Sequence, residues 1–262
     1  MPHAHVNGID LYYETYGRGK EAVVFAHGLG GNHLSWWQQI PVFSERYRCV
    51  VFDHRGFGLS ADAPGGPGIR AFVDDLAGLL EHLEIGRAFV VGQSMGGFSA
   101  LGLALAHPER TRAIVMADTT FPYVGPRTRE MMRRQGDRAR TEAGVLRGTA
   151  YSEAYARRDP EGAFLYEAIS RLNPPRPDDF FAPWRLPPSP PAEALEALRV
   201  PALFLCGADD PLFPPAAMEE AQRRVSGSRL VVVPDAGHSV YWERADAFNE
   251  AVLSFVEACA GD

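Results

Sequence analysis

The sequence predicts an α/β fold in which helices cover both faces of a doubly wound, mostly parallel sheet. Six short apolar runs recur along the chain, without the polar alternation expected of a sheet with one wet face. Segments with apolar residues three and four positions apart lie between several of these runs and indicate amphipathic helices. Strand and helix therefore alternate, which implies right-handed crossovers between parallel strands. The six runs are residues 22–26, 49–52, 88–91, 113–117, 202–206 and 230–233.

The chain opens with a predicted β-hairpin. Asn7 and Gly8 stand between two short alternating segments, and both tolerate the positive φ that a two-residue hairpin turn needs. Helical periodicity follows further along the chain, in residues 69–85, 95–110 and 241–260.

A long interval, residues 121–191, contains no strand-like apolar run. It is rich in arginine and then in proline, and a structureless loop of this length is unusual inside a compact domain. We therefore expect a helical cap segment (121–191) inserted into a core formed by residues 1–120 and 192–262. Its candidate helices are residues 127–147, 151–158 and 161–172.

The composition excludes several classes of partner. The chain has 262 residues, 46% of them hydrophobic, and a formal net charge of −7. It can bury one sizeable core but offers no net basic surface for nucleic acid or anionic lipid. No signal peptide is expected, and no apolar stretch approaches the roughly 20 residues that span a bilayer.

Three cysteines without paired spacing favour free thiols in a reducing compartment. We expect a cytoplasmic monomer or homodimer that acts on a small molecule without a metal or a cofactor.

Residues 92–96 read Gly-Gln-Ser-Met-Gly, a serine with a glycine two residues away on either side. An apolar strand leads into this motif and an alanine- and leucine-rich helix follows it, which is the context of a nucleophile on a sharp turn. A Cβ at Gly92 or Gly96 would collide where strand and helix nearly touch, and the helix N-terminus directs free N–H groups at the serine. The alternatives are a helix-capping serine and a phosphate-binding loop, and the glycine and lysine spacing of the latter is missing. Ser94 is the predicted nucleophile.

A serine hydroxyl needs a base within hydrogen-bond reach, and the base needs an acid that fixes its tautomer. His238 follows the last apolar run and comes directly after a flexible glycine, so it is the favoured base. Asp209 and Asp210 follow the preceding run, and Asp118 ends the strand after the serine's own helix. Position alone leaves the choice of acid open, with Asp118 as the main rival.

Acyl transfer also needs donors for the developing oxyanion. The segment Phe25–Gly31, FAHGLGG, follows the first buried run and offers a glycine-flanked amide at Leu29. The amide of Met95 directly follows the serine. These two N–H groups form the predicted oxyanion hole.

Five ordered motifs make the chain resemble the α/β-hydrolase superfamily over nearly its whole length: HGLGG, DHRGFGLS, GQSMGG, GADDPLFP and DAGHSVYWERADAFNEAVLSFV. The resemblance implies an eight-stranded, mostly parallel sheet with a helical cap inserted between the sixth and seventh core strands. It places the acid three residues after Gly207, at Asp210, with Asp209 as second choice. It also gives Asp53 and Arg55 a loop-organising role.

The serine in the turn departs from the aspartate of the related epoxide hydrolases and haloalkane dehalogenases. Among the serine members, the chain looks like carboxylesterases, 3-oxoadipate enol-lactonases and non-haem perhydrolases. The resemblance therefore implies a hydrolase that cleaves a small carboxylic ester or lactone through an acyl-enzyme. The alternatives are hydrolysis of carbon–carbon bonds in ring-cleavage products by the same residues, and a non-catalytic ligand-binding protein.

The candidate substrate-binding residues lie beside the proposed catalytic loops or in the cap segment, and most are apolar, which suits a hydrophobic acyl or alcohol group. Several could equally be ordinary core residues. Arginines of the cap segment could pair with a substrate carboxylate, although a solvated helix face is the simpler interpretation. The candidates are Trp36, Phe121, Tyr123, Trp184, Phe213 and Val240, beside Leu29 and Met95, and the arginines are Arg133, Arg134, Arg138 and Arg140.

Overall fold

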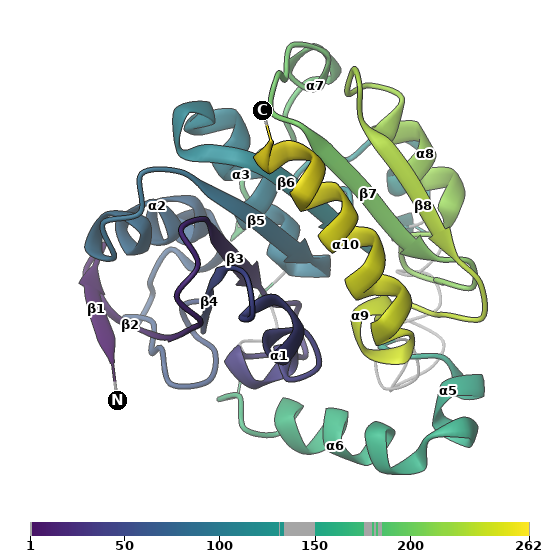
Figure 1. Ribbon diagram of the computed structural model, residues 1–262, viewed down its shortest axis with the longest axis horizontal. Helices are drawn as coiled ribbons and strands as arrows, with labels where there is room; N and C mark the ends of the chain where they lie inside the picture. The colour runs from purple at the N-terminus through teal and green to yellow at the C-terminus, as the bar shows by residue number, and fades with distance from the viewer. Residues whose placement is uncertain are drawn as a thin grey trace.

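The computed structural model describes residues 2–130, 132–133, 150–175, 180, 182 and 185–261 of the chain. Its centre is an eight-stranded sheet with the strand order β1-β2-β4-β3-β5-β6-β7-β8 (Figure 1). Strands β3 to β8 are parallel, whereas β2 pairs antiparallel with both β1 and β4. The strands are β1 (His3–Val6), β2 (Ile9–Tyr16), β3 (Ala22–Ala26), β4 (Arg48–Phe52), β5 (Ala88–Gln93), β6 (Thr111–Ala117), β7 (Ala202–Gly207) and β8 (Arg229–Val233).

Every predicted apolar run forms a strand, so the doubly wound, mostly parallel sheet is confirmed. All residues of β3, β5 and β7 are buried, as expected for central parallel strands with both faces covered. The N-terminal hairpin is confirmed as well. Asn7 and Gly8 adopt φ of 47° and 77° and place Val6 opposite Ile9.

Alternate strand side chains enter two hydrophobic clusters, one on each face of the sheet. In β3, Val24 belongs to one cluster, and Val23 and Phe25 belong to the other. The helices α2, α3 and α8 cover the first cluster, and α1 and α10 cover the second, where Figure 1 shows α10 lying across the sheet. These helices are α1 (Ile40–Phe43), α2 (Phe72–His82), α3 (Gly97–Ala106), α8 (Pro215–Gln222) and α10 (Ala245–Ala260).

The chain between β6 and β7 contains α5 (Glu153–Arg158), α6 (Pro160–Ser170) and α7 (Ala192–Glu196). Helix α5 lies within the candidate helix 151–158, and α6 begins one residue before the candidate helix 161–172 and ends within it. In the remaining candidate helix, residues 127–147, residues 127–130 and 132–133 are helical. Residues 131 and 134–149 lie outside the described residues. The expectations for Arg134, Arg138 and Arg140 therefore lie outside them too.

Cys49 and Cys206 are buried free thiols, which agrees with the expectation for these two residues. In the described part of the chain, no helix combines the length and apolarity needed to cross a membrane.

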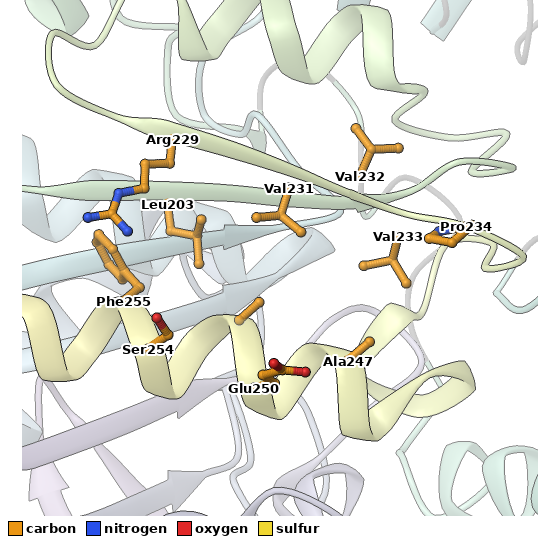
Figure 2. Close-up of a pocket in the computed structure, with 11 residues that line it drawn as sticks. Leu203, Arg229, Val231, Val232, Val233, Pro234, Ala247, Glu250, Ser254 and Phe255 are labelled. Carbon is orange, nitrogen blue, oxygen red and sulfur yellow. The ribbon is translucent and has the colours of Figure 1, made fainter.

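A groove of about 410 Å³ lies between β8 and α10, at the edge of the sheet (Figure 2). Val231, Val233 and Phe255 give it apolar walls, and Arg229 and Glu250 add one charge of each sign. None of the predicted site residues lines this groove, so it is separate from the site described below.

Candidate active site

Ser94 lies on a sharp turn between β5 and the short helix η3 (Ser94–Gly96), which leads into α3. Its φ is 49°, in the left-handed region that residues other than glycine rarely adopt. A Cβ on Gly92 would lie 2.5 Å from the carbonyl oxygen of Gly96, and a Cβ on Gly96 would lie 2.0 Å from that of Ala26. The turn therefore requires glycine at both positions, for the steric reason that the sequence suggested.

A continuous chain of hydrogen bonds connects Ser94, His238 and Asp210. His238 Nε2 lies 2.8 Å from Ser94 Oγ, and His238 Nδ1 lies 3.1 Å and 3.0 Å from the two carboxylate oxygens of Asp210. Asp210 Oδ1 also accepts hydrogen bonds from the backbone N–H groups of Leu212, at 2.7 Å, and Phe213, at 3.0 Å. Because a carboxylate only accepts, Nδ1 carries the imidazole proton and Nε2 faces the serine hydroxyl as an acceptor.

Asp118, the rival acid, is fully buried at the end of β6 and bonds to backbone instead of an imidazole. Its Oδ1 accepts from the N–H of Gly207 and its Oδ2 from the N–H of Val240, both at 3.2 Å. Burial, followed by the nearby charge of Asp210, raises the pKa of Asp118 well above its ordinary value. Asp118 therefore holds the loops that carry Asp210 and His238.

The loop after β3 lies against the serine turn. Strands β3 and β5 pair with Ala26 opposite Gly92, so the loops that follow them share one edge of the sheet. A Cβ on Gly28 would lie 3.2 Å from Ser94 Cβ, which shows how closely the two loops approach. Leu29 follows Gly28, and Met95 is the residue directly after Ser94. Their role as oxyanion donors stays a prediction.

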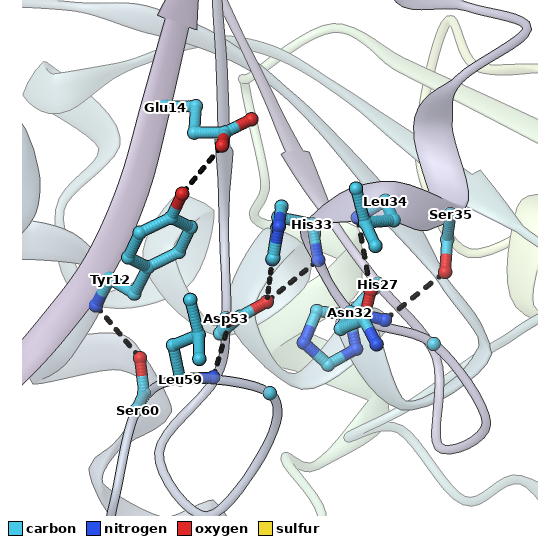
Figure 3. A network of polar contacts seen from close by, with 12 residues as sticks. Tyr12, Glu14, His27, Asn32, His33, Leu34, Ser35, Asp53, Leu59 and Ser60 are labelled. Carbon is cyan, nitrogen blue, oxygen red and sulfur yellow. Dashed lines mark hydrogen bonds and ion pairs between the residues drawn. The ribbon is translucent and has the colours of Figure 1, made fainter. Parts of the chain in front are cut away.

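Buried polar contacts fix the shape of this loop (Figure 3). Asp53 Oδ1 accepts from the His33 backbone N–H at 2.7 Å and lies 2.8 Å from His33 Nδ1, while its Oδ2 accepts from Leu59 N–H at 2.8 Å. Arg55 forms a buried ion pair with Asp75. The contacts of Asp53 and Arg55 are thus with loops and neighbouring elements, in agreement with the loop-organising role that the resemblance implied.

The loop that carries His238 has two anchors that sequence reasoning missed. Gln93 Nε2 donates to the carbonyl oxygen of His238 at 2.9 Å. Glu243 Oε1 accepts from the Gly237 N–H at 3.0 Å, and Glu243 Oε2 accepts from Ser152 Oγ, at the start of α5, at 2.6 Å. Glu243 lies in α9 (Val240–Glu243). No local pattern marks these residues, because their partners are set by the tertiary fold.

Asn173, just after α6, is a third residue that the sequence did not indicate. Its Nδ2 donates to the carbonyl oxygens of Gly30 and Gly31, at 3.4 Å and 3.1 Å, and its Oδ1 accepts from Gly58 N–H at 3.0 Å. One amide side chain thus connects the cap segment to the loop after β3 and to the loop after β4.

Some of the predicted substrate-binding residues lie beside His238 or Met95, and some are buried in the core. Phe213 stacks on His238 with ring centroids 6.0 Å apart, Phe121 packs edge-on against Phe213 at 5.0 Å, and Leu29 packs in the same apolar cluster as Met95. Tyr123 and Phe213 are buried in the cluster on one face of the sheet, and Val240 is buried in the cluster on the other face.

Trp36 requires a correction. It has no exposed surface, and it packs against Phe25 and Tyr241 with centroids 5.1 Å and 4.8 Å apart, so it is a core residue. Trp184 lies outside the described residues.

Across those residues that the structure describes, no group of three His, Cys, Asp or Glu side chains is arranged to hold a metal ion.

Comparison with known proteins agrees with this fold. A family model described as the alpha/beta hydrolase fold matches residues 21–245, so the chain belongs to the alpha/beta hydrolase family. It is 31% identical to the putative carbamate hydrolase RutD of Caulobacter sp. (strain K31), over 94% of this chain and 95% of that protein.

Two solved structures are similar over almost the full chain. The thermophilic esterase from Thermogutta terrifontis has a TM-score of 0.81 and 29% identity, with 98% of both chains covered. The enol-lactonase from Burkholderia xenovorans LB400 has a TM-score of 0.77 and 28% identity, with 98% of this chain and 100% of that chain covered.

Proposed function

We propose that this protein is a serine hydrolase that cleaves a small carboxylic ester or lactone through an acyl-enzyme, with Ser94, His238 and Asp210 as its catalytic residues. The observation that carries the proposal is the hydrogen-bonded chain from Ser94 Oγ through His238 to Asp210. A hydroxyl activated in this way is a nucleophile for acyl carbon, because the base that removes its proton is already in contact.

In the proposed reaction, Ser94 Oγ attacks the carbonyl carbon while its proton passes to His238 Nε2. The carbonyl oxygen becomes an oxyanion that the amides of Leu29 and Met95 stabilise. When the carbon–oxygen bond to the alcohol breaks, His238 returns the proton to the leaving oxygen. A water molecule, deprotonated by His238, then attacks the acyl carbon. When the bond between the acyl carbon and Ser94 Oγ breaks, His238 returns the proton to Ser94 Oγ and the acid is released.

The surroundings of Ser94 favour an apolar substrate. Leu29, Met95 and Phe121 belong to one apolar cluster, and Phe213 packs between Phe121 and the imidazole of His238. The similar proteins described as an esterase and an enol-lactonase support ester or lactone chemistry for this chain. We infer that residues 121–191 form a cap over the site, supported by the contacts of Asn173 with the loop after β3.

The test is hydrolysis of a panel of p-nitrophenyl esters, simple lactones and carbamates by the purified protein and by Ser94→Ala. We expect turnover of short esters or lactones by the wild type and a loss of at least about 10⁴-fold in kcat for the variant. Wild-type rates in Ser94→Ala would refute the mechanism. Cleavage of coloured ring-fission diketones with little esterase activity would favour the carbon–carbon alternative, and absence of any turnover would favour the ligand-binding one.

A further inference from the structure

Gln93 directly precedes Ser94 and has no part in the reaction steps above, yet it is only 2% exposed. Its Nε2 donates to the carbonyl oxygen of His238, 145 residues away in the sequence. Because a carbonyl can only accept, the amide nitrogen must face His238. The amide oxygen then faces Gly28, where a Cβ would lie 2.1 Å from it. Gln93 therefore lies between the loop after β3 and the loop that carries His238.

The backbone N–H groups of three residues beside His238 bond to carboxylates. The N–H groups of Gly237 and Ser239 both point at Glu243 Oε1, at 3.0 Å and 3.5 Å. The N–H of Val240 donates to Asp118. The carbonyl of His238, in contrast, accepts from the neutral side chain of Gln93, the last residue of the strand that leads to Ser94.

We propose that Gln93 is a positioning residue for His238, which keeps the imidazole within reach of Ser94 through the backbone of the histidine loop. This inference rests on the proposed function and adds a residue to it. Gln93 and Ser94 are consecutive in the chain, so the anchor of the base lies directly beside the nucleophile. Proton transfer needs a heavy-atom separation near the 2.8 Å observed, and a displacement of about 1 Å can lower a rate about 100-fold.

The variant Gln93→Met tests this role, because methionine has a similar length and lacks the donor. Gln39 supplies a matched control. It is fully buried, and its Nε2 donates to the carbonyl oxygen of Tyr241 at 2.8 Å, three residues beyond His238. Gln39→Met therefore removes the same kind of hydrogen bond from the same region without touching the carbonyl of His238.

We expect Gln93→Met to lower kcat for a short p-nitrophenyl ester by about 10- to 100-fold with little change in KM, because the substrate contacts are intact. The rate of inactivation by a fluorophosphonate should fall in parallel. Gln39→Met should lose a similar amount of thermal stability and keep kcat within about twofold of the wild type. Gln93→Glu, which keeps the size and also removes the donor, should lower kcat at least as much as Gln93→Met.

Wild-type kcat in Gln93→Met, or an equal loss of kcat in Gln39→Met, would overturn the positioning role. A rise in KM without a fall in kcat would also overturn it, since that pattern belongs to substrate binding. These outcomes are distinct from failure of the proposed function. That function fails if the wild type hydrolyses no ester or lactone, or if Ser94→Ala keeps the wild-type rate, and neither result depends on Gln93.

Discussion

Two buried aspartates, Asp210 and Asp118, lie near the histidine loop, and only Asp210 contacts the imidazole. Asp210 lies 3.0 Å from His238 Nδ1, whereas both oxygens of Asp118 bond to backbone N–H groups. The contrast follows from their strands. Asp210 lies on the loop beyond β7, whereas Asp118 directly follows the last residue of β6 and bonds to the end of β7 and to the start of α9.

Replacement of each carboxylate by its amide separates these roles. Asp210→Asn keeps the size but removes the charge that fixes the imidazole tautomer, so we expect kcat to fall about 10³- to 10⁴-fold. Asp118→Asn loses one acceptor for a backbone N–H and should cost about 1 kcal/mol of stability with less than about a tenfold effect on kcat. Steady-state kinetics and urea unfolding of both variants give the comparison. A larger loss of kcat in Asp118→Asn would reverse the assignment.

At the scale of elements, the serine turn is set by how closely β5 approaches α3 and β3. A side chain on Gly96 would meet the backbone of β3, which cannot move without disturbing the centre of the sheet. The strained φ of Ser94 is therefore maintained by packing around it.

Gly96→Ala should destabilise the protein by about 3 kcal/mol and lower kcat about 100-fold, because the turn must shift to admit the Cβ. Gly86→Ala is the matched control, since a Cβ on Gly86 meets nothing within 4 Å. Its free energy of unfolding should stay within about 0.5 kcal/mol of the wild type. Chemical unfolding and ester hydrolysis of the two variants check the contrast, and equal effects would contradict the steric explanation.

The same elements show how far the sequence predicts the fold and the site. Continuous apolar runs revealed all six parallel strands, and glycine spacing revealed the turn at Ser94, because these signals are local. The choice between Asp118 and Asp210 needed either a family resemblance or the coordinates, since both follow buried strands. Gln93 and Asn173 could not be assigned, because each acts through a backbone group far away in the sequence. Trp36 was misplaced because an aromatic residue near a catalytic loop and a core aromatic residue look alike in sequence.

At the scale of the whole molecule, a buried histidine links stability to pH. His54 is 1% exposed, stacks on Phe72 with centroids 4.2 Å apart, and lies 2.9 Å from Ser99 Oγ through Nε2. Burial, followed by the neighbouring His27, lowers the pKa of His54 well below its ordinary value of 6.5. The folded state therefore holds His54 neutral where the unfolded chain would protonate it.

The sign of the pH effect follows from this difference. The unfolded chain binds more protons below pH 6.5, so stability is full above that pH and is lost as the pH falls. The loss of stability that His54 contributes therefore grows as the pH falls below 6.5. Urea unfolding at pH 7.5 and 5.5 should therefore show a steeper loss for the wild type than for His54→Gln. The same slope in both proteins would show that His54 titrates normally in the folded state.

The central claim for the whole molecule is that Ser94 is the nucleophile of a hydrolase. The most direct test is to treat the protein with a fluorophosphonate, map the adduct by peptide mass spectrometry and follow residual ester hydrolysis. We predict one adduct on Ser94, activity lost in proportion to labelling, and no adduct in Ser94→Ala. Hydrolysis that persists when Ser94 is fully labelled, or an adduct that forms elsewhere and abolishes activity, would contradict the account.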